Sequence, residues 1–170
     1  MTQVEINKQA RLSQHFTLGE LCKTSAKTQD GNIPSHVHIE NLKRLCGWLE
    51  MLRSEWNKRY GEGDDPIIIN SGYRSEAVNK AVGGVKGSNH LIGCAADIRV
   101  AGMEQALRYA VILLDISDER QRVGDGTSGM SREDFDELLL ERSPRGTYWL
   151  HLAVRPPSQE NRRKIRFIQT

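Results

Sequence analysis

Three residues from two distant segments place the strongest constraint on how this chain can fold. His90 and Asp97 lie in one short segment, separated by Gly93, and His151 lies far along the chain. Glycine adopts backbone conformations that other residues reach only at a cost, so Gly93 permits a sharp turn between the first two. Two imidazoles and one carboxylate match the three protein ligands of a catalytic zinc site, which keeps a fourth position open. A site exists only if the fold brings the two segments together.

The local patterns around these residues indicate strands. Residues 94–100 begin with small side chains and continue as a short apolar run around Asp97, and residues 148–154 form an aromatic and β-branched run around His151. Both patterns are typical of strands. Neighbouring strands of one sheet would place the two runs side by side. Taken alone, Asp97 could equally be a strand-end carboxylate that pairs with Arg99.

The best predicted helix covers residues 35–59. Its apolar residues recur at spacings of three and four, which predicts one face packed on a core; they are Ile39, Leu42, Cys46, Leu49, Leu52 and Trp56. After it, residues 66–70 predict a buried strand that delivers Arg74 to its end. A short helix is predicted over residues 76–82, and a second well-defined helix is predicted over residues 103–114.

Two later segments are less regular. Residues 115–130 are polar and contain glycine, so we interpret them as a connection between elements. Residues 131–141 begin like a helix, with Ser131 three positions before Asp134, yet residues 138–140 are leucines that would also fill a strand. Periodicity does not decide between helix and strand here.

Several motifs, in order along the chain, resemble one enzyme family. Residues 71–75 (SGYRS), residues 78–84 (VNKAVGG) and the pattern S-x-H-x-x-G-x-x-x-D over residues 88–97 resemble the M15 zinc peptidases. This is the group of D-alanyl-D-alanine carboxypeptidases and L-alanyl-D-glutamate endopeptidases. Outside these motifs, further segments resemble the branch common in phages and gut bacteria: residues 16–21 (FTLGEL), 41–45 (NLKRL), 135–141 (FDELLLE) and 149–151 (WLH).

The resemblance implies a fold and an activity. The fold would be α+β, a small antiparallel sheet that carries the zinc site with helices packed on one side, and it favours a strand over residues 131–141. The activity would be zinc-dependent hydrolysis of peptidoglycan stem or cross-link peptides containing D-amino acids. Carboxypeptidase and endopeptidase activity both remain open, and one Zn²⁺ per chain is expected.

The same resemblance implies roles for individual residues. His90, Asp97 and His151 would be the zinc ligands, and Arg74 and Ser88 would hold the peptide substrate. Many members of the family carry a carboxylate three residues before the last histidine, where this chain has Tyr148.

The branch that this chain resembles places that acid at the end of the preceding strand instead, which points to Glu141 as the general base. The alternative is that Glu141 is a surface charge at a strand end.

Other functional classes have less support. His15, His36 and His38 lack partners at ligand spacing, and the three cysteines form no CxxC pair, so a structural zinc site is not predicted. An inactive zinc-containing binding module of the same fold is the main alternative, because Tyr148 replaces the common carboxylate. A structural or interaction protein that binds no metal is the third hypothesis.

Composition fits one enzyme domain without a nucleic-acid partner. The chain has 170 residues and a net charge of only +2. We expect a loose leader over residues 1–15, a zinc peptidase domain over residues 16–156, and a basic C-terminal tail over residues 157–170. A monomer is expected. With neither a membrane span nor a signal peptide in the sequence, we expect synthesis in the cytoplasm and release to the cell wall by a phage-type route, or action on wall peptides inside the cell.

Overall fold

A computed structural model describes residues 6–123 and 134–170 of the chain. Within these ranges the helices are α1 (Leu18–Leu21), α2 (His36–Arg59), α3 (Glu76–Ala81), the 3₁₀ helix η1 (Asn89–Ile92) and α4 (Met103–Val123). The strands are β1 (Ile69–Ser71), β2 (Ala95–Arg99), β3 (Glu137–Arg142), β4 (Tyr148–Ala153) and β5 (Lys164–Gln169). This arrangement confirms the predicted α+β class.

The described strands form one five-stranded sheet in the order β1-β2-β4-β3-β5. The pairs β1–β2, β2–β4 and β4–β3 are antiparallel, whereas β5 joins β3 in parallel. The chain therefore places β4, which comes late in the sequence, between β2 and β3. This order brings the segments around Asp97 and His151 into direct contact.

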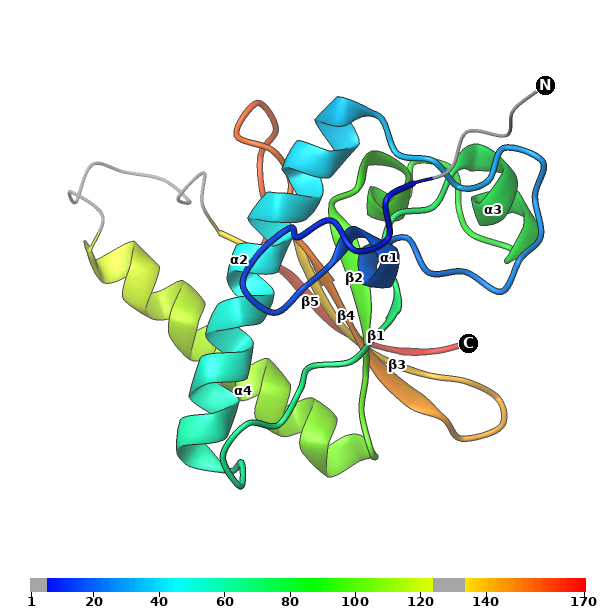
Figure 1. Cartoon of the computed structure of the whole chain (residues 1–170). Helices are drawn as coiled ribbons and strands as arrows, with labels where there is room; N and C mark the ends of the chain where they lie inside the picture. Colours follow the sequence, from blue (N-terminus) through cyan, green and yellow to red (C-terminus); the bar gives the residue numbers. More distant parts are fainter. Residues whose placement is uncertain (1–5, 124–133) are drawn as a thin grey trace.

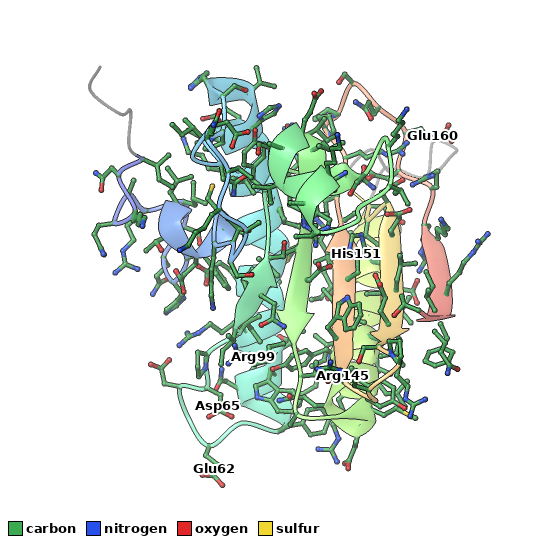
Figure 2. All side chains as sticks on the ribbon, turned by 90° about the vertical axis from the view of Figure 1, so that its right-hand side faces the viewer. Glu62, Asp65, Arg99, Arg145, His151 and Glu160 are labelled. Atoms are coloured by element: carbon green, nitrogen blue, oxygen red, sulfur yellow. The ribbon has the colours of Figure 1, made fainter. Side chains whose placement is uncertain are left out.

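The two long helices cover one face of the sheet (Figure 1). The apolar stripe of α2 is buried, with Leu42, Leu45 and Leu49 at 0% exposure. Alternate residues of the strands, such as Ile98 and Leu150, point into the same core. Because successive side chains in a strand point to opposite faces, the residues between them belong to the face opposite α2 and α4. That second face carries the polar side chains of the sheet, and His151 lies on it (Figure 2).

Helix α4 extends further than the sequence predicts. The predicted helix ends at residue 114, but α4 continues to Val123, so the polar connection expected from residue 115 is wrong as far as Val123. Ile116 continues the apolar stripe of Tyr109 and Ile112, and its side chain is buried. The rest of the expected connection, and the start of the segment 131–141, lie outside the described residues. The strand predicted there appears as β3.

Both ends of the described chain are more ordered than expected. In the predicted leader, the backbone of Arg11 forms a β-bridge with Thr17, and Ile6 and Leu12 pack against the core. In the predicted basic tail, β5 pairs along its whole length with β3. A loose leader is therefore wrong for residues 6–15, whereas residues 164–169 form a strand whose side chains are mostly exposed. The domain boundaries themselves remain predictions.

Among the described residues, none of the helices is both long enough and apolar enough to cross a bilayer.

Candidate metal centre

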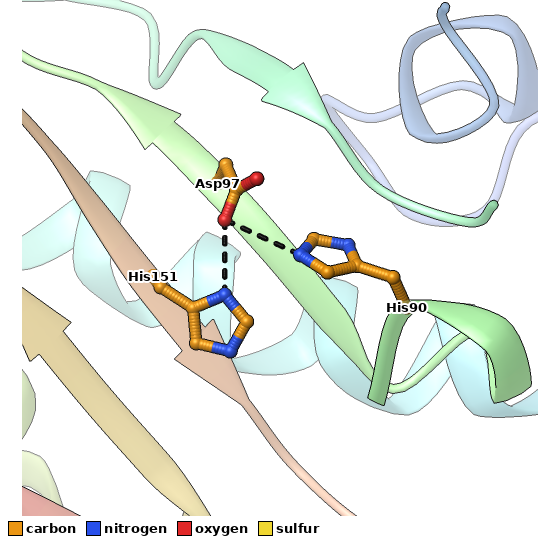
Figure 3. Close-up of side chains that lie close together, drawn as sticks. All are labelled: His90, Asp97 and His151. Atoms are coloured by element: carbon orange, nitrogen blue, oxygen red, sulfur yellow. Dashed lines mark hydrogen bonds and ion pairs between the residues drawn. The ribbon is translucent and has the colours of Figure 1, made fainter. Parts of the chain in front are cut away.

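Three side chains that the sequence singles out converge at one point of the sheet face opposite α2 and α4 (Figure 3). The Asp97 Oδ1 atom lies 2.9 Å from Nδ1 of His151 and 3.3 Å from Nε2 of His90. One ligand atom from each residue lies within 4.8 Å of the other two, and all three side chains are buried. One carboxylate oxygen and two imidazole nitrogens at this spacing form a donor set that a single metal ion can share.

Strand pairing places two of these ligands. Asp97 on β2 is directly opposite His151 on β4 in the antiparallel register. Directly opposite residues in such a pair project from the same face with their Cβ atoms about 5 Å apart. The register therefore brings the carboxylate and the imidazole together without any loop.

A tight turn places the third ligand. Ser88 caps η1 by accepting a hydrogen bond from the His90 amide, and Gly93 ends η1 in the left-handed conformation at φ 71°. A Cβ atom at Gly93 would also lie 2.6 Å from the His38 carbonyl oxygen. Glycine is thus required both for the turn and for the close approach of α2, as the sequence predicts for the turn.

Hydrogen bonds fix the orientation of the His90 ring and of Asp97. Nδ1 of His90 lies 2.6 Å from the Gly72 carbonyl oxygen. A carbonyl can only accept, so Nδ1 donates and the lone pair of Nε2 faces Asp97. Arg74 donates from Nη2 to Asp97 Oδ2 at 2.6 Å, and its Nε donates to Ser71 at 2.8 Å. Arg74 therefore holds the oxygen of Asp97 that does not face the two histidines.

The electrostatics of the cluster keep Asp97 ionised. Burial alone would raise the pKa of Asp97, but the neighbouring His90 and the hydrogen bond from His151 lower it well below the usual range. Burial lowers the pKa of His90, which favours the neutral imidazole that a metal needs. Burial also disfavours the charged form of His151, yet the hydrogen bonds to Asp97 and Glu137 outweigh it and raise its pKa to about 9. A metal at Nδ1 would replace a proton there.

Glu137 is a member of this site that sequence reasoning missed. Its Oε2 atom lies 3.3 Å from Nε2 of His151, the ring nitrogen that does not face Asp97. Asn89 donates to the same oxygen at 3.1 Å, while Arg162 and Lys164 donate to Oε1 at 2.9 and 3.3 Å. The hydrogen bond with His151 contributes most to lowering the pKa of Glu137, to about 2. Glu137 is therefore a fixed anion behind a candidate ligand.

Glu141 lies in a different environment on the same strand face. Leu139 is opposite His151, so Glu137 and Glu141 flank that histidine two residues away on either side. Among the described residues, the Glu141 carboxylate accepts no hydrogen bond, and burial raises its pKa. A carboxyl group with a raised pKa is better suited to take up and release a proton near neutral pH than one with a lowered pKa.

A cavity of about 640 Å³ opens over the cluster. Its walls include the three candidate ligands and all three other residues that the sequence predicts for the site: Arg74, Ser88 and Glu141. The structure therefore brings the complete predicted set to one cavity. It also adds Glu137 and Trp149 to the walls.

The excluded residues lie elsewhere. His15 pairs with Glu50 at 2.7 Å, and Nδ1 of His38 accepts the Ser35 amide at the start of α2. The three cysteines are buried and unpaired, and burial raises the pKa of the Cys94 thiol to about 12. Such a thiol is a poor metal ligand, because the thiolate is the binding form.

Two comparisons with known proteins add independent findings. The family model described as Peptidase M15 matches residues 14–119. The zinc D-Ala-D-Ala carboxypeptidase of Streptomyces albus G is 31% identical over 84 residues, which cover 49% of this chain. The aligned part spans only 31% of that protein.

Proposed function

Since the chain belongs to the Peptidase M15 family, we propose that it is a zinc-dependent peptidase acting on peptidoglycan peptides. The observation that carries this proposal is the convergence of His90, Asp97 and His151 at the wall of one cavity. Two buried imidazoles and a carboxylate are a ligand set typical of catalytic zinc, with the fourth position left for water or substrate. The name of the Streptomyces relative supports the choice of metal.

The residues present fit a zinc ion. Nε2 of His90 and Nδ1 of His151 would bind it together with Asp97 Oδ1, and each ligand has its own supporting contact. Such supporting hydrogen bonds are the usual companions of metal-bound histidines. When bound, zinc polarises the peptide carbonyl and lowers the pKa of water, so that the water can act as a nucleophile near neutral pH.

Glu141 is the general base of this proposal. It lines the cavity beside His151, accepts no hydrogen bond within the described part of the chain, and has a raised pKa. It would take the proton from the attacking water and return it to the leaving amine. Glu137 is less suited to this role, because four donors hold its carboxylate and its pKa is lowered to about 2.

Arg74 and Ser88 would hold the substrate. Arg74 donates from Nε to Ser71 and from one terminal nitrogen to Asp97, and its side chain still lines the cavity. Its remaining donors would bind a carboxylate or a carbonyl of the peptide. The Ser88 hydroxyl accepts a hydrogen bond from the His90 amide, and its own O–H would donate to a substrate carbonyl.

The substrate class is a stem or cross-link peptide that contains a D-amino acid. This choice is supported by the family and by the name of the relative, zinc D-Ala-D-Ala carboxypeptidase. Cleavage of a terminal residue and cleavage within a cross-link are both compatible with this proposal. An inactive zinc-binding module is the second candidate, and the absence of a carboxylate at Tyr148 is the observation that favours it.

The test combines metal content with hydrolysis. We expect about one zinc per wild-type chain, lost in His90→Ala together with release of peptides from purified peptidoglycan. His36→Ala serves as the matched control, because His36 is exposed at the start of α2 and should keep both properties. Zinc binding without hydrolysis would favour the binding module. No zinc binding after reconstitution would refute the site.

A further inference from the structure

Three basic side chains gather along one wall of the cavity beside the candidate metal centre. Arg155 follows β4, Arg162 precedes β5, and Lys164 is the first residue of β5; all three line the cavity. We call them the basic shelf. None of the roles assigned above accounts for why three cations lie here.

A buried carboxylate holds the shelf in place. The Asp136 side chain is completely buried, and it accepts from Arg162 Nε at 2.9 Å and from Arg162 Nη2 at 2.6 Å. Arg155 Nε lies 3.1 Å from the same carboxylate. Bidentate pairing of this kind fixes the plane of a guanidinium group. The shelf is therefore an ordered group rather than a set of mobile surface side chains.

The shelf retains positive charge and donors. Its three cations face two carboxylates, Asp136 and Glu137, which leaves one positive charge in excess. The side chains of Arg162 and Lys164 are 44% and 30% exposed, whereas those of Asp136 and Glu137 are 0% and 14% exposed. Within the described residues, Nη1 of Arg162 makes no hydrogen bond, and Nζ of Lys164 donates only to Glu137. The excess charge and the free donors are thus on the accessible side.

The strand order places the shelf opposite Arg74. Arg74 follows β1 at one edge of the sheet, the candidate ligands Asp97 and His151 lie on β2 and β4, and the shelf adjoins β3 and β5 at the other edge. Glu137 connects the two parts, since it contacts both His151 and Lys164. A peptide whose scissile bond lies over the metal centre would have Arg74 on one side and the shelf on the other.

We propose that the basic shelf binds a carboxylate group of the substrate peptide, on the side of the metal centre away from Arg74. This proposal rests on the proposed function, and it narrows the substrate to peptides that carry a free carboxylate near the scissile bond. A single carboxylate matches the single excess positive charge. The planar donors of Arg162 and the ammonium of Lys164 suit its two oxygens.

Binding measurements with paired peptides test the proposal. The zinc-loaded full chain carries Glu141→Gln to slow cleavage, and mass spectrometry checks that the peptide stays intact. Calorimetry then compares a stem peptide with all carboxylates free against peptides in which one carboxylate at a time is a carboxamide. We expect one of these replacements to weaken binding about tenfold, as loss of a charge-assisted hydrogen bond does.

Shelf variants make the test specific. In Lys164→Gln and Arg162→Gln, the same carboxamide replacement should have little further effect, because its partner is already lost. Lys164→Gln is the milder change, since Lys164 contacts only Glu137 through its side chain. Arg145→Gln is the charge-matched control, because Arg145 is exposed in the β3–β4 hairpin and does not line the cavity (Figure 2).

The outcomes separate this proposal from the proposed function. Equal weakening of all peptides by the shelf variants, or no detectable binding of the acidic peptide at millimolar concentration, would overturn the shelf as a carboxylate site. Selective coupling in a chain whose wild type hydrolyses no peptide would keep the shelf and refute the peptidase. Hydrolysis by the wild type without this selective coupling would keep the peptidase and refute the shelf as a carboxylate site.

Discussion

Replacing Glu137 tests whether a carboxylate behind His151 tunes metal binding. In the structure, Oε2 of Glu137 lies 3.3 Å from Nε2 of His151, while Nδ1 faces Asp97. A carboxylate at Nε2 keeps the proton on that nitrogen and leaves Nδ1 as the metal-binding atom. Glu137→Ala removes this control of the tautomer and the negative charge that strengthens the ligand.

The expected loss of zinc affinity is about 10- to 100-fold, or about 1.4 to 2.7 kcal/mol, the usual effect of removing such a supporting group. The distance of 3.3 Å is long for a charge-assisted hydrogen bond, which favours the lower half of that range. Glu137→Gln keeps an acceptor for Nε2 but loses the charge, so we expect a smaller loss.

Competition with a chromogenic chelator at fixed pH measures the affinity. Glu62→Ala is the control, because Glu62 is exposed in the loop after α2, far from His151 (Figure 2). Thermal unfolding of the metal-free variants separates an effect on folding from an effect on the metal. Wild-type zinc affinity in Glu137→Ala would refute this role of Glu137.

Three further predictions concern catalysis, stability and thiol chemistry. Glu141→Gln should keep zinc but lower kcat by about 10²- to 10⁴-fold, and unchanged turnover in the variant would contradict this. A base must be deprotonated, and burial raises the pKa of Glu141, so wild-type activity should fall as the pH drops through a value above the pKa of an ordinary carboxyl group. Asp136→Ala removes a completely buried carboxylate that pairs with two arginines, and it should lower the free energy of unfolding by about 3 kcal/mol, or Tm by about 6 to 12 °C. A loss below about 1 kcal/mol in denaturant unfolding would argue against this prediction. Burial raises the pKa of the Cys22, Cys46 and Cys94 thiols to about 12. A disulfide reagent at pH 8 should therefore modify these thiols only after unfolding. Fast labelling of the native chain would contradict this prediction, because it would show that the thiols are accessible.

The candidate ligands could be predicted from the sequence because the motifs around them resemble those of a known family and the local patterns indicate a turn and two strands. Gly93 marks the turn after His90, and the runs around Asp97 and His151 have the composition of strands. The strand register could not be read from the sequence. The direct pairing of Asp97 with His151 depends on β4 lying between β2 and β3, which is a property of the whole sheet.

Other features were missed although a local signal was present. In β5, Lys164 and Arg166 alternate with Ile165 and Phe167, which is the two-residue period of a strand, but the basic cluster obscured it. The role of Glu137 had a weaker signal. Its spacing of four residues from Glu141 puts both on one face of a strand, yet its partners come from η1, β4 and β5.

The partner strand distinguishes the two glutamates of β3. Glu137 and Glu141 share one strand face and flank His151 symmetrically in sequence, but of the two it is Glu137 that contacts Nε2 of His151. Strand β5 adds to this difference, because it places Lys164 beside Glu137 and Ile168 beside Glu141. A neighbouring ammonium stabilises a carboxylate anion, whereas an apolar neighbour withholds that stabilisation. The C-terminal segment thus reinforces the contact with His151 that makes Glu137 a fixed anion, although it contributes no candidate ligand to the metal centre.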